Sequence, residues 1–240
     1  MKISKEIGYV LLAEMLILVP SVSHIVLSSR ITSPMRIPLS IISAVFGFID
    51  TFLLLYTSFK NPGRCSKCFT SEEQPAIVEL GQETFSLKVC PTCKTLKDLR
   101  THHCKVCDYC VDRLDHHCPW VANCIGRHNH RQFVLLLIFT TLHSCYLLIV
   151  NSLEMAFLDP PPGNYGGEII LIIISVVLGW SLASLLGYQL YLISKNMTTH
   201  EHRRKLFKKN PFSTTFCSNC MAFWKMTKEQ YKFAQNDNKC

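Results

Sequence analysis

Residues 90–124 concentrate side chains that bind metals and side chains that act as nucleophiles. The run CPTCKTLKDLRTHHCKVCDYCVDRLDHHCPWVANC holds seven cysteines and four histidines. A structural zinc ion takes four protein ligands, commonly three cysteines and one histidine, so two sites use six thiolates and two imidazoles. One cysteine and two histidines remain. In residues 115–118 an aspartate, two histidines and a cysteine lie together, and a thiol beside an unligated imidazole and a carboxylate is typical of a nucleophile.

Two tight cysteine pairs in this segment indicate metal binding. The CxxC spacing places two thiolates on one turn, where they can hold one zinc ion. The candidate ligands are Cys90 and Cys93, Cys104 and Cys107, Cys110 and Cys124, with imidazoles from His102, His103, His116 and His117. The loop has few apolar residues for a core, so we expect the metals to hold it together. Catalysis must then come from the side chains that the metals leave free.

Four apolar blocks predict a membrane protein. Of the 240 residues, 48% are hydrophobic, and they gather in residues 7–27, 38–59, 133–157 and 169–193. A helix of about 20 residues crosses a hydrocarbon core of about 30 Å. We therefore predict an all-α polytopic membrane protein with four transmembrane helices.

The first two blocks contain residues that are unusual at bilayer depth. Glu14 and Pro20 lie in the first block and Asp50 in the second. A carboxyl group is costly in hydrocarbon unless it faces other helices or water, so we expect Glu14 and Asp50 to make hydrogen-bonded contacts between helices. The first block also has the pattern of a signal peptide, with Lys2 and Lys5 ahead of the apolar run, and cleavage would leave three spans.

The positions of lysine and arginine predict the orientation. Of the 25, eleven lie in residues 60–132 and ten in residues 195–240, whereas the two short connections on the other side carry only Arg30 and Arg36. Positive charge stays cytoplasmic, so both termini and the cysteine-rich loop should face the cytosol. Disulfides are disfavoured there, which again favours metal binding.

This pattern divides the chain into four parts. Residues 1–59 form transmembrane helices 1 and 2, residues 60–132 form a cytosolic zinc-binding catalytic domain with its core at 90–133, residues 133–194 form helices 3 and 4, and residues 195–240 form a cytosolic tail. The net charge of +8 fits this topology and an attraction to anionic lipid. No clear basic patch with interleaved aromatics is present, so nucleic acid is excluded as a partner.

The cysteine-rich segment resembles that of the DHHC family of protein S-acyltransferases, membrane enzymes that attach palmitate or similar acyl chains to protein cysteines. The matching residues are Cys90, Cys93, His103, Cys104, Cys107, Cys110, the run DHHCPW at 115–120, Asn123, Cys124, Ile125, Gly126, Asn129 and Phe133. Outside it, Asn61-Pro62-Gly63 resembles the family's Asp-Pro-Gly, Thr198-Thr199-His200-Glu201 its Thr-Thr-x-Glu, and Asn210-Pro211-Phe212 with Asn219 its C-terminal aromatic and Asn motif. The number of spans and the position of the loop agree as well.

The resemblance implies how the ligands pair. One zinc ion would take Cys90, Cys93, His103 and Cys110, and the other would take Cys104, Cys107, His117 and Cys124. Such interleaved sites would lock the two halves of the loop together. Asp115, His116 and Cys118 stay unligated, which agrees with the count of spare residues. His102 is expected to be a surface side chain, although from the sequence alone it can exchange roles with His103.

The unligated residues suit a two-step acyl transfer. An ordinary thiol, with a pKa of about 8.5, is only slightly ionised at neutral pH. His116 is placed to take the proton of Cys118, and Asp115 to orient the imidazole. The thiolate would attack the thioester of an acyl-CoA such as palmitoyl-CoA, and then pass the acyl group to a substrate cysteine in ping-pong order. A sixteen-carbon chain gains on the order of 10 kcal/mol by burial, so we expect a cavity between the spans.

The resemblance also assigns roles to charged and tail residues. Lys97 and Arg100 fall where the family has a Lys/Arg-Pro-x-Arg motif and would contact the phosphates of CoA, although Asp98 replaces the proline and the pattern alone indicates a solvated face. Thr199 would hydrogen-bond toward the catalytic carboxylate, and Asn219 would tie the tail to the helices. The simpler interpretation of residues 198–201 is a helix cap.

Two positions depart from the family pattern, and Trp120 fits two different environments. Asn61 stands where the family usually has Asp, and Ala122 where Asn is common. The second change leaves one fewer hydrogen-bonding side chain. Trp120 follows the nucleophile closely, and it fits either the membrane interface, which favours amphipathic rings, or the packing of the loop.

A second class of function is a catalytically inactive, membrane-anchored zinc scaffold. Such a module has no use for a spare cysteine beside Asp-His, so the sequence favours the enzyme. A redox role for the CxxC pairs is disfavoured because zinc would occupy the thiols. Two further pairs, Cys65 and Cys68, and Cys217 and Cys220, lie near predicted membrane boundaries and are candidates for S-acylation or a third metal site.

The expected partners follow from this chemistry. They are membrane lipid, acyl-CoA as the donor, and membrane-associated substrate proteins with cytosolic cysteines. We expect two structural zinc ions and a location in the endomembrane system, in the Golgi or endoplasmic reticulum, with the plasma membrane as the alternative.

Overall fold

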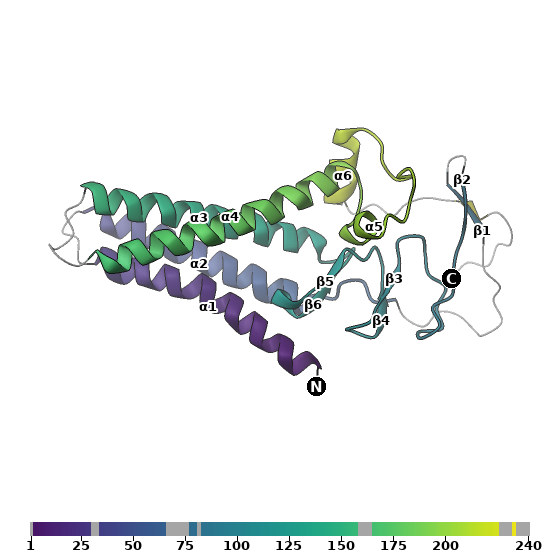
Figure 1. Cartoon of the computed structure of the whole chain (residues 1–240), viewed down its shortest axis with the longest axis horizontal. Helices are drawn as coiled ribbons and strands as arrows, with labels where there is room; N and C mark the ends of the chain where they lie inside the picture. Colours follow the sequence, from purple (N-terminus) through teal and green to yellow (C-terminus); the bar gives the residue numbers. More distant parts are fainter. Residues whose placement is uncertain are drawn as a thin grey trace. The chain divides into compact units, whose positions relative to one another are not determined.

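The structure is a computed structural model that describes residues 2–29, 34–65, 77–80, 83–157, 165–225 and 232–233. It contains two compact units, which we describe separately (Figure 1). The first comprises Ile3–Ser58 and Gln132–Tyr188, and the second comprises Phe59–Arg131 and Gln189–Cys240. The cysteine-rich loop and the C-terminal tail, far apart in the sequence, therefore belong to one unit.

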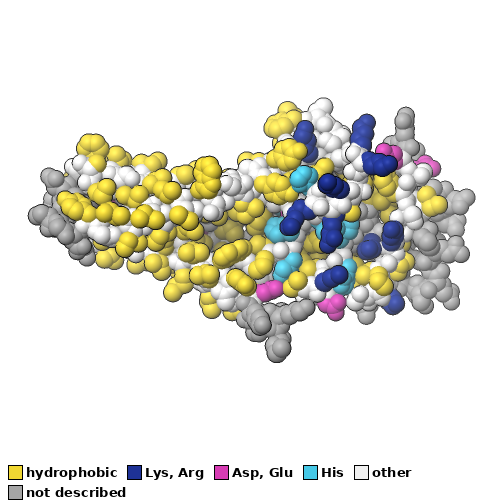
Figure 2. Space-filling model, in the orientation of Figure 1, with side chains coloured by type: hydrophobic (Ala, Val, Ile, Leu, Met, Phe, Trp, Pro, Cys, Tyr) yellow, Lys and Arg dark blue, Asp and Glu magenta, His cyan; other side chains and the backbone are white. Residues whose placement is uncertain are grey.

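Four long helices supply the first unit: α1 (Lys2–Ser28), α2 (Arg36–Phe59), α3 (His130–Phe157) and α4 (Gly166–Ser194). Their apolar spans are 23 to 29 residues long, about 35 to 44 Å at 1.5 Å per residue. Apolar side chains predominate on the face of the bundle that Figure 2 shows, and Phe48 and Trp180 are more than 70% exposed. Lipid accommodates such a surface and water does not. The prediction of four membrane-capable helices is confirmed.

Polar side chains inside the bundle pair between helices. Nδ1 of His143 on α3 lies 2.7 Å from Oδ2 of Asp50 on α2, and the hydroxyl of Thr51 donates to Glu14 on α1 at 3.1 Å. Ser21 of α1 lies 3.4 Å from Nε2 of His143. Pairing compensates a buried carboxyl group for its lost hydration. The prediction that Glu14 and Asp50 make hydrogen-bonded contacts between helices is confirmed.

Replacing His143 by leucine should destabilise the bundle, because Asp50 would stay buried without its partner. Removing one member of a buried pair costs about 3 kcal/mol or more, so the melting temperature of the purified protein should fall by several degrees. The double substitution Asp50→Leu with His143→Leu should recover most of the loss. A double variant no more stable than the single one would show that the pair does not cause it.

Short antiparallel strands shape the second unit. Strand β3 (His102–Cys104) pairs with β4 (Tyr109–Val111), and β5 (His116–Cys118) pairs with β6 (Asn123–Ile125). A third sheet has the order β2-β1-β7, with β1 (Ile77–Leu80), β2 (Glu83–Ser86) and β7 (Lys232–Phe233). The chain is mostly helical, as predicted, but these strands were not predicted. Strands of two to four residues are too short to show a hydrophobic period.

The tail contributes two short helices, α5 (Thr199–Arg204) and α6 (Phe216–Lys225). A capping box begins α5: the Thr198 hydroxyl accepts from the Glu201 N–H at 3.2 Å, and the Glu201 carboxylate accepts from the Thr198 N–H at 2.8 Å. These contacts satisfy backbone donors that a helix start leaves unpaired. The interpretation of this run as a helix cap is confirmed for Thr198 and Glu201, and the next side chain, Thr199, is left for another partner.

Candidate active site

Among the described residues of the second unit, two clusters of three cysteines and one histidine form. They are Cys90, Cys93, His103 and Cys110, and Cys104, Cys107, His117 and Cys124. Within each cluster the ligand atoms lie within 4.8 Å of one another. These are the two sets that the resemblance implied, and each could hold one metal ion. His103, and not His102, takes part.

The hairpin register brings the ligands of each cluster together. His103 lies opposite Cys110 in β3 and β4, and His117 lies opposite Cys124 in β5 and β6. After each CxxC pair the backbone turns through a left-handed residue, Lys94 with φ 56° and Asp108 with φ 58°. Each cluster thus combines a turn with a cross-strand pair.

The donor atoms are spaced as zinc requires. Nδ1 of His103 lies 3.3 Å from Sγ of Cys93 and 3.6 Å from Sγ of Cys90. Nδ1 of His117 lies 3.3 Å from Sγ of Cys107 and 3.7 Å from Sγ of Cys124. Tetrahedral zinc, with bonds of about 2.3 Å to sulfur and about 2.0 Å to nitrogen, separates these donors by about 3.5 Å. The residues therefore fit the metal.

The alternation of side chains along β5 separates Cys118, the candidate nucleophile, from the candidate metal ligands. Successive residues of a strand point to opposite faces, so His117 points to its cluster while His116 and Cys118 share the other face. Cys118 is buried, with 5% of its surface exposed, and it belongs to neither cluster. The spare cysteine that the count predicted is therefore Cys118.

Asp115 is a fully buried carboxylate that collects hydrogen bonds from two parts of the chain. Its Oδ2 lies 2.7 Å from Nδ1 of His116. From the start of α5, Thr199 donates its backbone N–H to Oδ1 and its hydroxyl to Oδ2, each at 2.8 Å. Burial alone would raise the pKa of Asp115, but the nearby His130 ring, the adjacent His116 and the hydrogen bond from the Thr199 backbone together lower it below its ordinary value. Asp115 is thus held as an anion.

His116 lies between the Asp115 carboxylate and the thiol of Cys118. Burial tends to lower its pKa, but hydrogen bonding to Asp115 and Cys118 outweighs burial and raises the pKa to about 10. Below that pH both ring nitrogens therefore carry a proton, and the ring is an imidazolium. An imidazolium next to a cysteine favours the thiolate, the form that attacks acyl groups.

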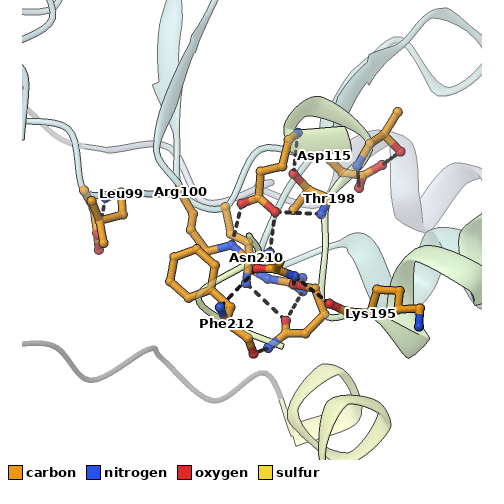
Figure 3. A network of polar contacts seen from close by, with 12 residues as sticks. Leu99, Arg100, Asp115, Lys195, Thr198, Asn210 and Phe212 are labelled. Atoms are coloured by element: carbon orange, nitrogen blue, oxygen red, sulfur yellow. Dashed lines mark hydrogen bonds and ion pairs between the residues drawn. The ribbon is translucent and has the colours of Figure 1, made fainter. Parts of the chain in front are cut away.

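A second network of polar contacts joins the cysteine-rich loop to the tail (Figure 3). The buried Arg100 guanidinium donates to both carboxylate oxygens of Glu201, at 2.6 and 2.8 Å, and to the side chain of Asn196 at 3.1 Å. The Asn196 amide in turn donates to the carbonyl of Phe212 at 2.8 Å, and Arg100 lies over the Phe212 ring at 4.4 Å. The network holds α5, which carries Thr199, against the loop.

Comparison with known proteins identifies the family. A family model described as DHHC palmitoyltransferase matches residues 83–206, more than half of the chain. The chain belongs to the DHHC palmitoyltransferase family.

Relatives in the DHHC family come from animals, plants and fungi. The chain is 31% identical over 226 residues to palmitoyltransferase ZDHHC18 of Rattus norvegicus, covering 78% of this chain and 58% of that protein. It is 29% identical over 214 residues to probable protein S-acyltransferase 7 of Arabidopsis thaliana, covering 74% and 47%, and 37% identical over 129 residues to palmitoyltransferase ERF2 of Kluyveromyces lactis, covering 53% and 36%. The matched regions cover 36 to 58% of the length of these curated relatives.

Of two departures from the DHHC family pattern, the structure explains the one at Asn61. The side-chain oxygen of Asn61 accepts the N–H groups of Gly63 and Arg64, both at 2.9 Å, so an amide oxygen serves here as a carboxylate oxygen would. Ala122 has a left-handed backbone with φ 46°, a conformation in which Asn is more readily accommodated than Ala. At Gly126 a side chain would meet Val111 and the Pro62 carbonyl at 2.5 and 2.6 Å, so only glycine fits.

The structure gives Arg100 a different environment from the predicted CoA contact. Only 2% of its surface is exposed, and its charge is compensated by Glu201. This arrangement favours a structural role for Arg100. Lys97 is half-buried, and its contact with CoA stays a prediction.

Asn219, Trp120 and His102 were also assigned roles from the sequence, and the structure shows the surroundings of each. The Asn219 amide donates to the carbonyl of Ser194, the last residue of α4, at 2.8 Å, which ties the tail to that helix. Trp120 is 47% exposed, which disfavours its role as a packing residue. Contrary to expectation, His102 is half-buried, and it stacks on His200 with ring centroids 4.1 Å apart.

The additional cysteines differ in their surroundings. Cys217 is exposed, and Cys65 and Cys220 are half-buried. Cys68 lies outside the described residues. Among the residues that the structure describes, these cysteines belong to neither metal cluster, and their S-acylation stays a prediction.

Several functional candidates were missed in the sequence. Arg113 and Asn196 belong to the network around Arg100, and Gln189 of α4 contacts Asp115. Of the three, only Gln189 was recognisable from the sequence, because a polar amide in an apolar helix is often functional. The other two are ordinary polar residues outside the motifs.

Replacing Cys104 by serine should remove zinc and stability together, whereas Cys118→Ser should leave both intact. A structural zinc ion contributes its binding free energy to folding, so the Cys104 variant should lose about one zinc ion per chain and melt well below the wild type. Metal analysis and thermal melting measure both effects. Equal zinc content and equal melting temperatures in the two variants would contradict this division of roles.

Replacing Arg100 by methionine should destabilise the protein without weakening acyl-CoA binding. The substitution leaves Glu201 buried and unpaired, at a cost of about 3 kcal/mol or more. The KM for acyl-CoA of the protein that remains folded should stay within about twofold, since the guanidinium binds Glu201. A KM for acyl-CoA raised about tenfold, with an unchanged melting temperature, would instead indicate that Arg100 contacts the CoA head group.

Proposed function

We propose that this protein is a protein S-acyltransferase that carries a long acyl chain, such as palmitoyl, from acyl-CoA through Cys118 to cysteines of other proteins. The single observation that carries the proposal is the arrangement of three residues beside two metal clusters that exclude Cys118: His116 and Cys118 share one face of β5, and Asp115, directly before β5, hydrogen-bonds to His116. Membership of the DHHC palmitoyltransferase family supports it. Spare nucleophilic chemistry of this kind has no use in a scaffold.

In the first step the Cys118 thiolate attacks the carbonyl carbon of the acyl-CoA thioester. The bond from that carbon to the CoA sulfur breaks, and the departing thiolate takes the proton that His116 carries. Asp115 keeps its negative charge and holds Nδ1 of His116, so that Nε2 faces the reacting groups. The products are free CoA and an acyl group bound to Cys118 as a thioester.

In the second step a substrate cysteine replaces the enzyme thiol. The now neutral His116 takes the proton of the substrate thiol, which attacks the acyl carbonyl. The thioester to Cys118 breaks, and Cys118 returns as a thiolate beside the protonated His116. The two steps balance without any oxidant, reductant or external base.

Zinc at the two clusters would act as a structural ion. Cys90, Cys93, His103 and Cys110 would hold one ion, and Cys104, Cys107, His117 and Cys124 the other. Bound zinc would fix the hairpins that carry the catalytic residues. His103 would use Nδ1 for the metal, and its Nε2 lies 3.5 Å from Asp108, a carboxylate that orients a metal-ligating imidazole.

We infer the cellular setting from charge and hydropathy. Both termini and the catalytic loop face the cytosol of an endomembrane compartment, the Golgi or endoplasmic reticulum, because the basic residues lie in the loop and tail. Acyl-CoA is then available from the cytosol. Substrates are membrane-associated proteins with cytosolic cysteines, and Lys97 contacts the CoA phosphates.

Purified protein in lipid nanodiscs, mixed with labelled palmitoyl-CoA, should take up hydroxylamine-sensitive label. Cys118→Ala should reduce the label on the chain to background, because the thioester forms at that sulfur. Cys145→Ala, which removes an exposed cysteine of α3, is the matched control and should label as the wild type does. A wild type that melts normally and binds zinc but takes up no label would favour the inactive scaffold.

A further inference from the structure

Gln189 is a buried polar residue of α4 that contacts the catalytic carboxylate. Its exposed fraction is 1%. The amide nitrogen lies 3.3 Å from Oδ2 of Asp115 and 3.2 Å from the hydroxyl of Thr199, and the amide oxygen lies 3.0 Å from Nε2 of His130. We propose that Gln189 is a positioning residue that fixes Asp115 and the Thr199 hydroxyl in the geometry that acyl transfer to Cys118 requires. This inference rests on the proposed function.

The chemistry of the partners sets the direction of the amide. An ionised carboxylate only accepts hydrogen bonds, so the group that faces Asp115 must be the NH2 of Gln189. The two amide hydrogens then serve two oxygens, Oδ2 of Asp115 and Oγ1 of Thr199. Because the Thr199 oxygen accepts from Gln189, its own proton is directed to Asp115, at 2.8 Å.

His130 fixes the other end of the amide. It is buried to 1% exposure, and its Nδ1 has no hydrogen-bond partner among the described residues. A proton on Nδ1 would be unsatisfied, whereas a proton on Nε2 faces the Gln189 oxygen, so Nε2 is the donor to that oxygen. Phe223 of α6 packs edge-on against the ring, with centroids 5.0 Å apart. This contact holds His130 in place.

The result is a directed chain that ends at the catalytic imidazole. His130 donates to Gln189, Gln189 donates to Thr199 and Asp115, and Thr199 donates to Asp115. Oδ2 of Asp115 therefore has donors on several sides and stays aimed at Nδ1 of His116, at 2.7 Å. If Gln189 were lost, the carboxylate could turn and the Thr199 hydroxyl could rotate, so that His116 would lose its fixed orientation toward Cys118.

The alternative is that Gln189 only fills space at the end of α4. The two roles differ in their response to substitution. Methionine matches glutamine in length and volume but cannot donate. Histidine is of similar length and keeps one N–H donor, which we expect to reach Asp115. A residue that fills space tolerates methionine, whereas a positioning residue tolerates histidine better.

The test measures the rate of acyl-enzyme formation at saturating labelled palmitoyl-CoA, with the KM, zinc content and melting temperature of each full-length variant. Gln189→Met should slow the single-turnover rate by about tenfold or more, with KM and zinc unchanged. Gln189→His should recover the rate to within about threefold of the wild type. Leu190→Met, an exposed neighbour on α4, is the matched control and should behave as the wild type.

A double-variant comparison checks the connection through Thr199. If Gln189 acts partly through that hydroxyl, Gln189→Met combined with Thr199→Val should slow the reaction by less than the product of the two single effects. If Gln189→Met fails to fold, His130→Phe replaces it: the ring and its packing remain, but the donor to Gln189 is lost, and the rate should still fall several-fold.

Two results would overturn the inference. One is a Gln189→Met rate, or in its place a His130→Phe rate, within twofold of the wild type. The other is a Gln189→His variant that is as slow as Gln189→Met while both keep zinc. Absence of label in the wild type would instead refute the proposed function, since that measurement involves no change at Gln189.

Discussion

The alternation of side chains along three-residue strands is the constraint on which the site depends. In β3 it sends His103 to one metal cluster and Cys104 to the other, so that adjacent residues serve different ions. In β5 it sends His117 to a cluster and leaves His116 and Cys118 on the opposite face. A shift of one residue in register would exchange these faces, placing Cys118 at the metal. The metal clusters and the nucleophile are therefore two consequences of one backbone geometry.

Asp115 connects this loop geometry to the rest of the second unit. It lies directly before β5, and its hydrogen bonds come from Thr199 at the start of α5 and from Gln189 near the end of α4. The capping box uses Thr198 and Glu201 to hold the start of α5, and Arg100 holds Glu201 from the loop. Residues 198–201 thus cap α5, form an ion pair with Arg100 and donate hydrogen bonds to the Asp115 carboxylate. Asp115, and through it the orientation of His116, is therefore supported by elements that are distant in sequence.

Buried charge is treated in the same way in both units. Asp50 meets His143 between the apolar helices, and Arg100 meets Glu201 between the loop and the tail. In each case the partner offsets part of the cost of leaving water. The contact with Glu201 therefore gives Arg100, which the family resemblance associated with CoA, a structural environment here.

The sequence by itself determined the four apolar helices, the two ligand sets through their resemblance to a family, and the surplus of one cysteine, because helix length, ligand type and ligand count are properties of local sequence. It did not reveal the short strands, the burial of Arg100, or the contacts of His143 and Gln189. The strands are too short to show a hydrophobic period. The contacts of Arg100, His143 and Gln189 join residues roughly 70 to 100 positions apart, and the local sequence does not show which distant residues meet. Only the tertiary structure decides which carboxylate receives which donor, since a buried polar group is stabilised by whatever partner the packing brings to it.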